Sequence, residues 1–189
     1  MLIVSQNLTK HDISIPDDAV FRINLAWCNS IEELNIILSK HKQNSIFIDL
    51  PTKRVKPPNN KYTLDDLLPI LKSNKQIKYL AISNVESPED LLQYIESVPS
   101  EINIVPKIES PTAVKNLAKI VNTLKNEKIV MLDHDDLFTS MINNQESPEH
   151  FKNYIQDLVE FCEINDIKLL RTVGVVFSDK EKRISQYIK

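Results

Sequence analysis

Three charged residues close two neighbouring apolar runs of the chain. Lys107 and Glu109 close the run 102–108, and Asp136 closes the next run, 128–132. Because the carboxyl ends of adjacent parallel strands meet at one edge of a sheet, we expect both carboxylates to point into one cleft with Lys107 beside them. Carboxylates suit a divalent cation such as Mg²⁺ or Mn²⁺. With the lysine as an added positive charge, the pattern predicts a metal site for an enolate-forming, small-molecule oxyacid.

The elements that must position these side chains alternate along the chain. Continuous apolar, β-branched runs indicate strands buried on both faces of a parallel sheet. They span residues 2–4, 20–27, 45–50, 79–83, 102–108, 128–132 and 167–177. Helix starts lie between them: Ser30 opens a capping box, and Ser-Pro pairs begin at Ser87, Ser110 and Ser147. This alternation predicts an α/β fold with right-handed crossovers.

The strand count limits the architecture. Seven strands are predicted, or eight if 167–177 divides around Gly174. A (β/α)8 TIM barrel usually needs about 250 residues, whereas this chain has 189. We therefore expect a small or incomplete barrel. No linker rich in Pro, Gly or Ser divides the sequence, so residues 1–189 are predicted to form one domain.

An incomplete barrel exposes strand edges that must be paired or covered. Residues 178–189 begin with a second capping-box pattern at Ser178 and carry an apolar face of Ile184, Tyr187 and Ile188. We expect this helix to pack across the open edge, or to exchange with a second copy and form a homodimer.

Composition excludes several classes of function. The net charge is −3 without a basic block, so neither nucleic acid nor a membrane surface is an expected partner. No apolar stretch approaches the roughly 18 residues of a membrane span, and residues 1–6 lack the basic region of a signal peptide. Cys28 and Cys162 are unclustered and predicted to be reduced thiols, which favours a cytoplasmic protein. A single glycine excludes the glycine-rich nucleotide-binding loops.

A polar face is also predicted on the strand that begins at residue 20. Arg22 and Asn24 are two positions apart and therefore share one face of that strand. Arg22 suits a bidentate contact with a phosphate or carboxylate of a ligand, and its alternative role is a structural ion pair. Asp49 ends the next strand along the chain.

At these positions the order of motifs resembles the pyruvate kinase family. The family's R-[IL]-N-F-S-H-G and D-T-K-G-P-E-I-R patterns are met at residues 22–28 and 49–54. Its D-F-I-A-x-S-F-V, K-I-E-N-x-x-(A/G)-V-x-N and M-V-A-R-G-D-L-G patterns follow in order at residues 79–85, 107–116 and 131–138. Five motifs in register, over residues 2–175, make the resemblance moderately specific. It implies a barrel domain of the pyruvate kinase type, within the superfamily of phosphoenolpyruvate and pyruvate barrels.

The resemblance also implies a role for each matched residue. Glu109 and Asp136 would bind the metal, and Lys107 would stabilise an enolate or a transferring phosphoryl group. Arg22 would be catalytic together with Lys107 and would bind the phosphate. The other substrate-binding residues would be Asn24, Asp49 and Ser83. Asn24 and Asp49 would also remain from the family's monovalent-cation site, but Ala26 and Leu50 replace its serine and threonine, so binding of that cation is in doubt.

The departures from the family pattern bear on activity. His134 and Asp135 stand where the family has Arg-Gly, and a carboxylate at Asp135 should repel a substrate carboxylate. Only residues 51–62 occupy the place of the family's lid domain, and the C-terminal domain is absent from this sequence. Without a lid, phosphoryl transfer is poorly shielded from water. Because it has no lid, the chain is closer in architecture to the citrate-lyase-like and pyruvate-dependent aldolases of the same superfamily. Those enzymes also bind Mg²⁺ through a Glu and an Asp from neighbouring strands.

Two hypotheses about function follow. The first is a metal-dependent enzyme that acts on pyruvate, phosphoenolpyruvate or a related 2-oxoacid through an enolate. The second is a catalytically silent module that binds a metabolite or a protein partner. The position of Asp135 distinguishes the two hypotheses. If its carboxylate joins the metal site, the enzyme hypothesis is favoured, and if it faces the pocket for the substrate carboxylate, the family's own substrate is excluded. His134 is expected to be an exposed loop residue, or else a ligand or base, and Cys28 a buried small hydrophobe.

Overall fold

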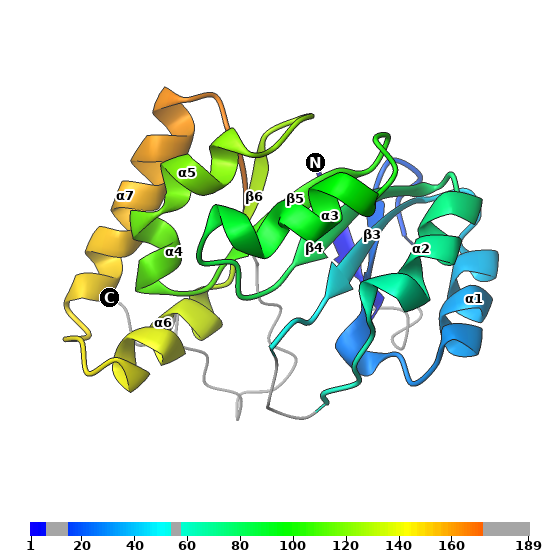
Figure 1. The fold of residues 1–189 in the computed structure, drawn as a ribbon, viewed down its shortest axis with the longest axis horizontal. Coiled ribbons are helices and arrows are strands. Elements are labelled where there is room, and N and C mark those ends of the chain that lie inside the picture. Colours follow the sequence, from blue (N-terminus) through cyan, green and yellow to red (C-terminus); the bar gives the residue numbers. More distant parts are fainter. Residues whose placement is uncertain (7–14, 54–57, 172–189) are drawn as a thin grey trace. The chain divides into compact units, whose positions relative to one another are not determined.

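The computed structural model describes residues 1–6, 15–53 and 58–171 (Figure 1). The chain divides into two compact units, the first made of residues 1–83 and 92–105 and the second of residues 84–91 and 106–189. Each is described by itself below, and the single domain expected from the sequence stays a prediction.

The first unit is built on four parallel strands that pair in chain order. They are β1 (Ile3–Ser5), β2 (Val20–Asn24), β3 (Ser45–Leu50) and β4 (Ile77–Ile82). Its helices are α1 (Ile31–Lys40), α2 (Leu64–Ser73) and α3 (Leu92–Ser97). The strand interiors are the core: Ile23, Phe47 and Leu80 have no exposed surface. Burial on both sheet faces explains why these strands are continuously apolar in sequence.

The capping residues of the first unit fix where its helices begin. The Ser30 hydroxyl accepts the Glu33 N–H at 3.2 Å and starts α1, as the capping-box pattern predicts. Strand β2 is shorter than predicted. Asn24 Oδ1 accepts the Ala26 N–H at 3.0 Å and turns the chain into a 3-10 helix, η2 (Leu25–Trp27). An Asx side chain that satisfies the backbone two residues on competes with a sheet ladder in this way.

The second unit contains parallel pairings among β5 (Asn103–Ile108), β6 (Ile129–Leu132) and β7 (Lys168–Arg171). The first half of β5 belongs to the first unit and its carboxyl end to the second. The helical elements of the second unit are η3 (Pro88–Leu91), α4 (Pro111–Lys115), α5 (Leu117–Asn122), α6 (His134–Asn143) and α7 (His150–Ile164). All four residues of β6 are buried.

The helix N-termini predicted from the three Ser-Pro pairs agree with the structure to different degrees. Ser110 caps α4 through the Ala113 N–H at 3.1 Å, and Pro111 occupies its first turn. Pro88 begins η3, whereas α7 begins at His150, two residues beyond Pro148. Helix α6 was not among the predicted elements. Its first turn carries Asp135 and Asp136, which place negative charge at the positive end of the helix dipole.

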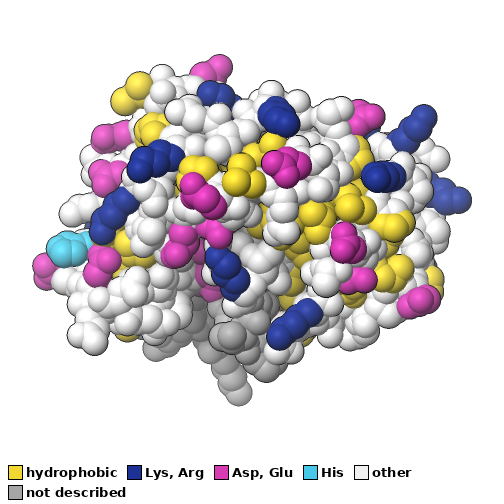
Figure 2. All heavy atoms as spheres, in the orientation of Figure 1, with side chains coloured by type: hydrophobic (Ala, Val, Ile, Leu, Met, Phe, Trp, Pro, Cys, Tyr) yellow, Lys and Arg dark blue, Asp and Glu magenta, His cyan; other side chains and the backbone are white. Residues whose placement is uncertain are grey.

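The predicted α/β class with parallel strands is confirmed. Every strand of the described residues pairs in parallel with a chain neighbour, in keeping with an incomplete TIM-barrel-like fold. The predicted helix over 178–189 and the strand residues 172–177 lie outside the described residues. In the described part of the chain, no helix has both the length and the apolar character needed to cross a membrane. Charged side chains of both signs are interspersed on the visible face (Figure 2).

Four described residues that are not glycine have a positive φ: Lys53, Asn84, Gln145 and Asp166, with φ between 52° and 59°. The left-handed region is costly for residues with a Cβ, although Asn and Asp tolerate it better than most. The one glycine of the chain, Gly174, lies outside the described residues.

Candidate functional site

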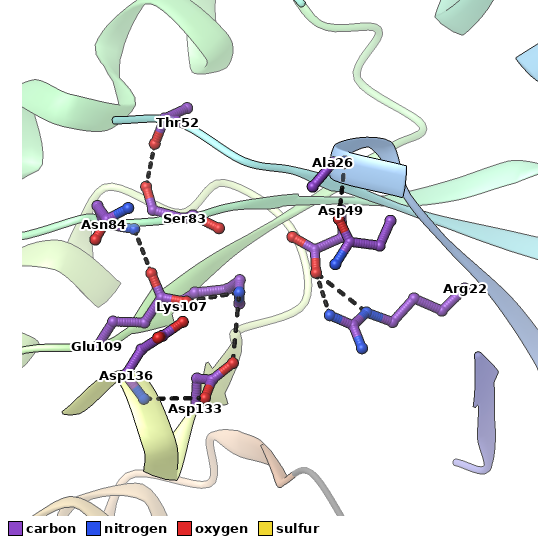
Figure 3. Close-up of polar contacts among 11 residues, drawn as sticks. Arg22, Ala26, Asp49, Thr52, Ser83, Asn84, Lys107, Glu109, Asp133 and Asp136 are labelled. Carbon is purple, nitrogen blue, oxygen red and sulfur yellow. Dashed lines mark hydrogen bonds and ion pairs between the residues drawn. The ribbon is translucent and has the colours of Figure 1, made fainter. Parts of the chain in front are cut away.

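Three carboxylates converge in the second unit. Glu109, Asp133 and Asp136 each offer an oxygen, and these oxygens all lie within 4.8 Å of one another. Lys107 joins them, with its Nζ 2.6 Å from Glu109 Oε1 and 3.7 Å from Asp133 Oδ2 (Figure 3). The predicted residues Lys107, Glu109 and Asp136 are therefore brought together, and their roles stay a prediction.

Strand β5 positions two of these side chains by its own period. Lys107 is its penultimate residue and Glu109 follows its last one, so both project from the same face. The two residues are only 5% and 4% exposed. Charges that are removed from water in this way interact more strongly than charges at the surface.

The two oxygens of Glu109 have different partners. Oε2 accepts the Asn84 N–H at 2.6 Å, and the buried Oε1 forms an ion pair with the Lys107 ammonium at 2.6 Å. Burial raises the pKa of the Glu109 carboxyl, and Lys107 and the Asn84 N–H oppose that shift. A buried carboxylate oxygen that lies close to two further carboxylates is the kind of atom that a metal ion can bind.

Glu86, two residues after Asn84, is hydrogen-bonded to the two residues that flank helix α4. The Ser110 hydroxyl donates to Glu86 Oε1 at 2.7 Å, and the Asn116 side-chain amide donates to the Glu86 carbonyl at 2.9 Å. Both contacts lie close in sequence to Asn84 and to Glu109. They hold the Asn84 N–H where Glu109 accepts it.

Asp133 is the member of the cluster that the sequence reasoning missed. It follows β6, and its N–H donates to the Ile108 carbonyl at 3.4 Å, which places it beside the end of β5. Its Oδ1 accepts the Asp136 N–H at 3.3 Å and caps α6. An Asp followed three residues later by an acidic residue, directly after an apolar run, is a helix-start signal that could have identified it.

The neighbours of Asp133 in the first turn of α6 lie outside the cluster. Asp135 is exposed and is not one of the three clustered carboxylates. His134 is half-buried, with Nε2 3.1 Å from an Arg171 guanidinium nitrogen. Its pKa is lowered by burial and by Arg171, while Asp133 and Asp135 act in the opposite direction.

The residues predicted in the first unit make contacts of their own. The Arg22 guanidinium contacts Asp49 Oδ2 with two nitrogens, and the Nε distance is 3.1 Å (Figure 3). Asp49 is only 1% exposed. This contact is the structural ion pair that was the alternative for Arg22, and the binding of a ligand anion by Arg22 stays a prediction.

Asn24 and Ser83 form hydrogen bonds within the same unit. Asn24 caps η2 and its N–H donates to Gln6 Oε1 at 2.9 Å. The Ser83 carbonyl accepts the Thr52 hydroxyl, and its N–H donates to the Leu50 carbonyl at 3.1 Å. These contacts give both residues a structural role, while substrate binding by either stays a prediction.

Both cysteines are buried free thiols. Burial raises the pKa of Cys28, and it raises that of Cys162 to about 11. Because the thiolate is the nucleophile, these pKa shifts agree with the expected role of Cys28 as a small hydrophobe.

Comparisons with known proteins bear on the fold. No family model and no curated protein matches the sequence. Among solved structures, RipC from Yersinia pestis is similar at 14% identity and a TM-score of 0.62, over 94% of this chain and 77% of that one. An HpcH/HpaI aldolase/citrate lyase family protein from Burkholderia cenocepacia J2315 is similar at 11% identity and a TM-score of 0.59, over 82% of this chain and 71% of that one.

At such identities the likeness extends to the fold alone. It agrees with the TIM-barrel-like class predicted from the alternating strands and helices. The pyruvate kinase family in particular gains no support from these two structures.

Proposed function

We propose that this chain is a divalent-metal-dependent enzyme of the lyase type, which acts on pyruvate, phosphoenolpyruvate or a related 2-oxoacid through an enolate. The observation that carries the proposal is the Lys107 ammonium, held 2.6 Å from Glu109 Oε1 inside a group of three carboxylates. The fold likeness to a protein described as an aldolase/citrate lyase family member favours a lyase over a phosphotransferase. The order of motifs still resembles that of pyruvate kinase.

The cluster fits a hard divalent cation. Its ligand groups are carboxylates, which suit Mg²⁺ or Mn²⁺ better than softer metals. Glu109 and Asp136 would hold the ion, and Glu109 Oε1 would then be shared between the ion and the Lys107 ammonium, which lies 2.6 Å from it. A divalent ion bound there would polarise the carbonyl of a 2-oxoacid and stabilise the charge that develops on its oxygen.

The chain itself would supply charge and shielding. The Lys107 ammonium would donate a hydrogen bond to the enolate oxygen as negative charge develops on it. Because Lys107 is buried, water would not weaken this electrostatic interaction. The Asn84 N–H fixes Glu109 through Oε2, so that Oε1 faces the cluster. The buried strand β6 directly precedes Asp133 in the sequence.

The test follows the methyl protons of pyruvate. In D₂O, enolate formation breaks a methyl C–H bond and returns a deuteron from solvent, which ¹H NMR records as loss of the methyl signal. We expect the full chain to accelerate this exchange with Mg²⁺ or Mn²⁺ and to lose the acceleration in EDTA. Glu109→Gln should also lose it, because the variant lacks a charged ligand. An exchange rate equal to that of buffer with metal would overturn the proposal.

We also expect negligible ADP-dependent turnover of phosphoenolpyruvate, even with Mg²⁺ and K⁺ present. The sequence lacks the lid that shields phosphoryl transfer, and Ala26 and Leu50 replace two residues of the monovalent-cation site. A coupled assay for pyruvate measures this directly. Robust turnover that disappears in Lys107→Ala would show that the lid is dispensable.

The second candidate function is a catalytically silent module that binds a metabolite or a protein partner. Two observations favour it. Asp135 is exposed and lies outside the carboxylate cluster, so the condition under which it would favour chemistry is not met. The Arg22 contact with Asp49 also engages the arginine expected to hold the substrate anion. This module would bind a 2-oxoacid without accelerating its methyl exchange. Isothermal titration beside the exchange assay separates the two candidates.

A further inference from the structure

The segment 84–91 lies in sequence between two stretches of the first unit, yet it belongs to the second unit. Two hydrogen bonds join it to the residues that directly follow β5. The Asn84 N–H donates to Glu109 Oε2 at 2.6 Å (Figure 3). The Ser110 hydroxyl donates to Glu86 Oε1 at 2.7 Å. Because the four residues form two neighbouring pairs, the second contact limits how far the first can move.

We propose that Glu86 is a positioning residue of the site, which acts on the reaction through Asn84 and Glu109. Its contact with Ser110 keeps the Asn84 N–H on one oxygen of Glu109. The other oxygen of that carboxylate then stays against the Lys107 ammonium. This inference rests on the proposed function, in which Lys107 and Glu109 face the enolate. It goes beyond that function because Glu86 is not part of the carboxylate cluster.

The Ser110 hydroxyl is a fixed anchor for Glu86. Its oxygen accepts the Ala113 N–H at 3.1 Å and caps α4, which leaves its proton for the Glu86 carboxylate. Ser110 is only 7% exposed, whereas Glu86 is exposed. A hydroxyl that donates to a carboxylate forms a stronger hydrogen bond than two neutral groups do. The contact therefore holds a surface side chain to a buried residue next to Glu109.

The main chain of Glu86 is also held. Its carbonyl accepts the Asn116 side-chain amide at 2.9 Å, and its N–H donates to Asp90 Oδ2 at 2.9 Å. Asp90 Oδ2 accepts the Ser87 N–H as well, at 3.0 Å. These contacts fix the turn before η3 and join it to the far end of α4. The Glu86 side chain adds the link to the residue that directly follows Glu109.

The contact should matter more for the reaction than for the fold. Substitutions at exposed positions usually change stability little. In contrast, a shift of a reacting group by about 1 Å can lower a rate about 10²-fold. Outer residues that orient the ligands of a metal change activity by about 10- to 100-fold. Loss of the Glu86 carboxylate should therefore lower the rate while the chain stays folded.

The test combines two NMR measurements on the full chain with Mg²⁺. In Glu86→Ala, the backbone amide of Asn84 should exchange with solvent faster, because local opening becomes easier. The kcat for exchange of pyruvate methyl protons should fall by about 10- to 100-fold. The KM for pyruvate should change little, because Lys107 and Glu109 meet the enolate only as its charge develops.

Two further variants show whether positioning is the cause. Glu86→Gln keeps a carbonyl oxygen for the Ser110 hydroxyl and should restore most of the kcat and the slow amide exchange. Glu89→Ala is the matched control, because it removes another exposed carboxylate from the segment 84–91. It should leave both measurements at the wild-type level.

The outcomes separate this inference from the proposed function. If the Asn84 amide exchanges as slowly in Glu86→Ala as in wild type, Glu86 does not position it and the inference is wrong. Faster amide exchange with a wild-type kcat would also overturn it, as would equal losses in Glu86→Ala and Glu89→Ala. A wild-type chain that does not accelerate methyl exchange overturns the proposed function, and the Asn84 amide then decides alone whether Glu86 positions Glu109.

Discussion

Replacing Lys107 with alanine should nearly abolish the metal-dependent exchange of pyruvate methyl protons while leaving Mn²⁺ binding at least as tight as in wild type. The lysine supplies positive charge where the enolate develops, and removal of one such donor costs about 10²- to 10³-fold in rate. Mn²⁺ binding should not suffer, because the ammonium lies against the same Glu109 oxygen that would bind the ion. The rate comes from ¹H NMR and the affinity from titration.

The control for this experiment is another lysine of the same unit. Lys115 lies over the ring of Tyr154, 5.7 Å from its centroid, and is not part of the carboxylate cluster. Lys115→Ala should keep both the exchange rate and the Mn²⁺ affinity. If Lys107→Ala exchanges within a few-fold of wild type, the lysine is only a counter-charge and the enolate must be stabilised in another way.

The largest effect on stability is expected from Arg22→Met, which should lower the free energy of unfolding by about 3 to 5 kcal/mol. The variant removes the guanidinium that contacts Asp49 with two nitrogens, while the Asp49 carboxylate stays buried at 1% exposure. Urea unfolding followed by circular dichroism measures the loss. A buried carboxylate that loses such a partner is costly because water cannot replace it.

A double-mutant cycle identifies the cause. Asp49→Asn in the Arg22→Met background should recover part of the stability, because the buried charge is removed with its partner. Lys78→Met, at an exposed position of β4, is the matched control and should change the free energy of unfolding by less than about 0.5 kcal/mol. A small loss in Arg22→Met together with weaker binding of a 2-oxoacid would instead favour the predicted contact with a ligand anion.

The strands could be predicted from the sequence because a strand that is buried on both faces of a sheet is apolar at nearly every position. The pairing of Lys107 with Glu109 was predictable for a related reason, since a period of two residues places both on one face. Asn24 was harder. It lies within a run that reads as strand to Trp27, and only its side-chain contact with the Ala26 N–H ends β2 early.

Other features depend on contacts across the chain that the sequence does not display. Whether Arg22 binds a ligand or an ion-pair partner depends on the register of two parallel strands, in which Asn24 lies opposite Asp49. Asp133 was overlooked because the resemblance directs attention to the motif aspartate three residues later. Helix α6 has an apolar face of Leu137, Phe138, Met141 and Ile142, and together with the Asp133 cap this face could have predicted the helix.

The left-handed backbone at Asn84 has a consequence for preorganisation. Glycine is the usual residue at such a φ, but its backbone samples many conformations. With glycine at position 84, the N–H that donates to Glu109 would be less ordered before a ligand binds. Asparagine tolerates φ 53° and has fewer alternatives to lose. With Glu86 fastened to Ser110 and Asn116, the entropy of ordering this donor is lost once, during folding. A ligand of the proposed site would then bind without losing that entropy again.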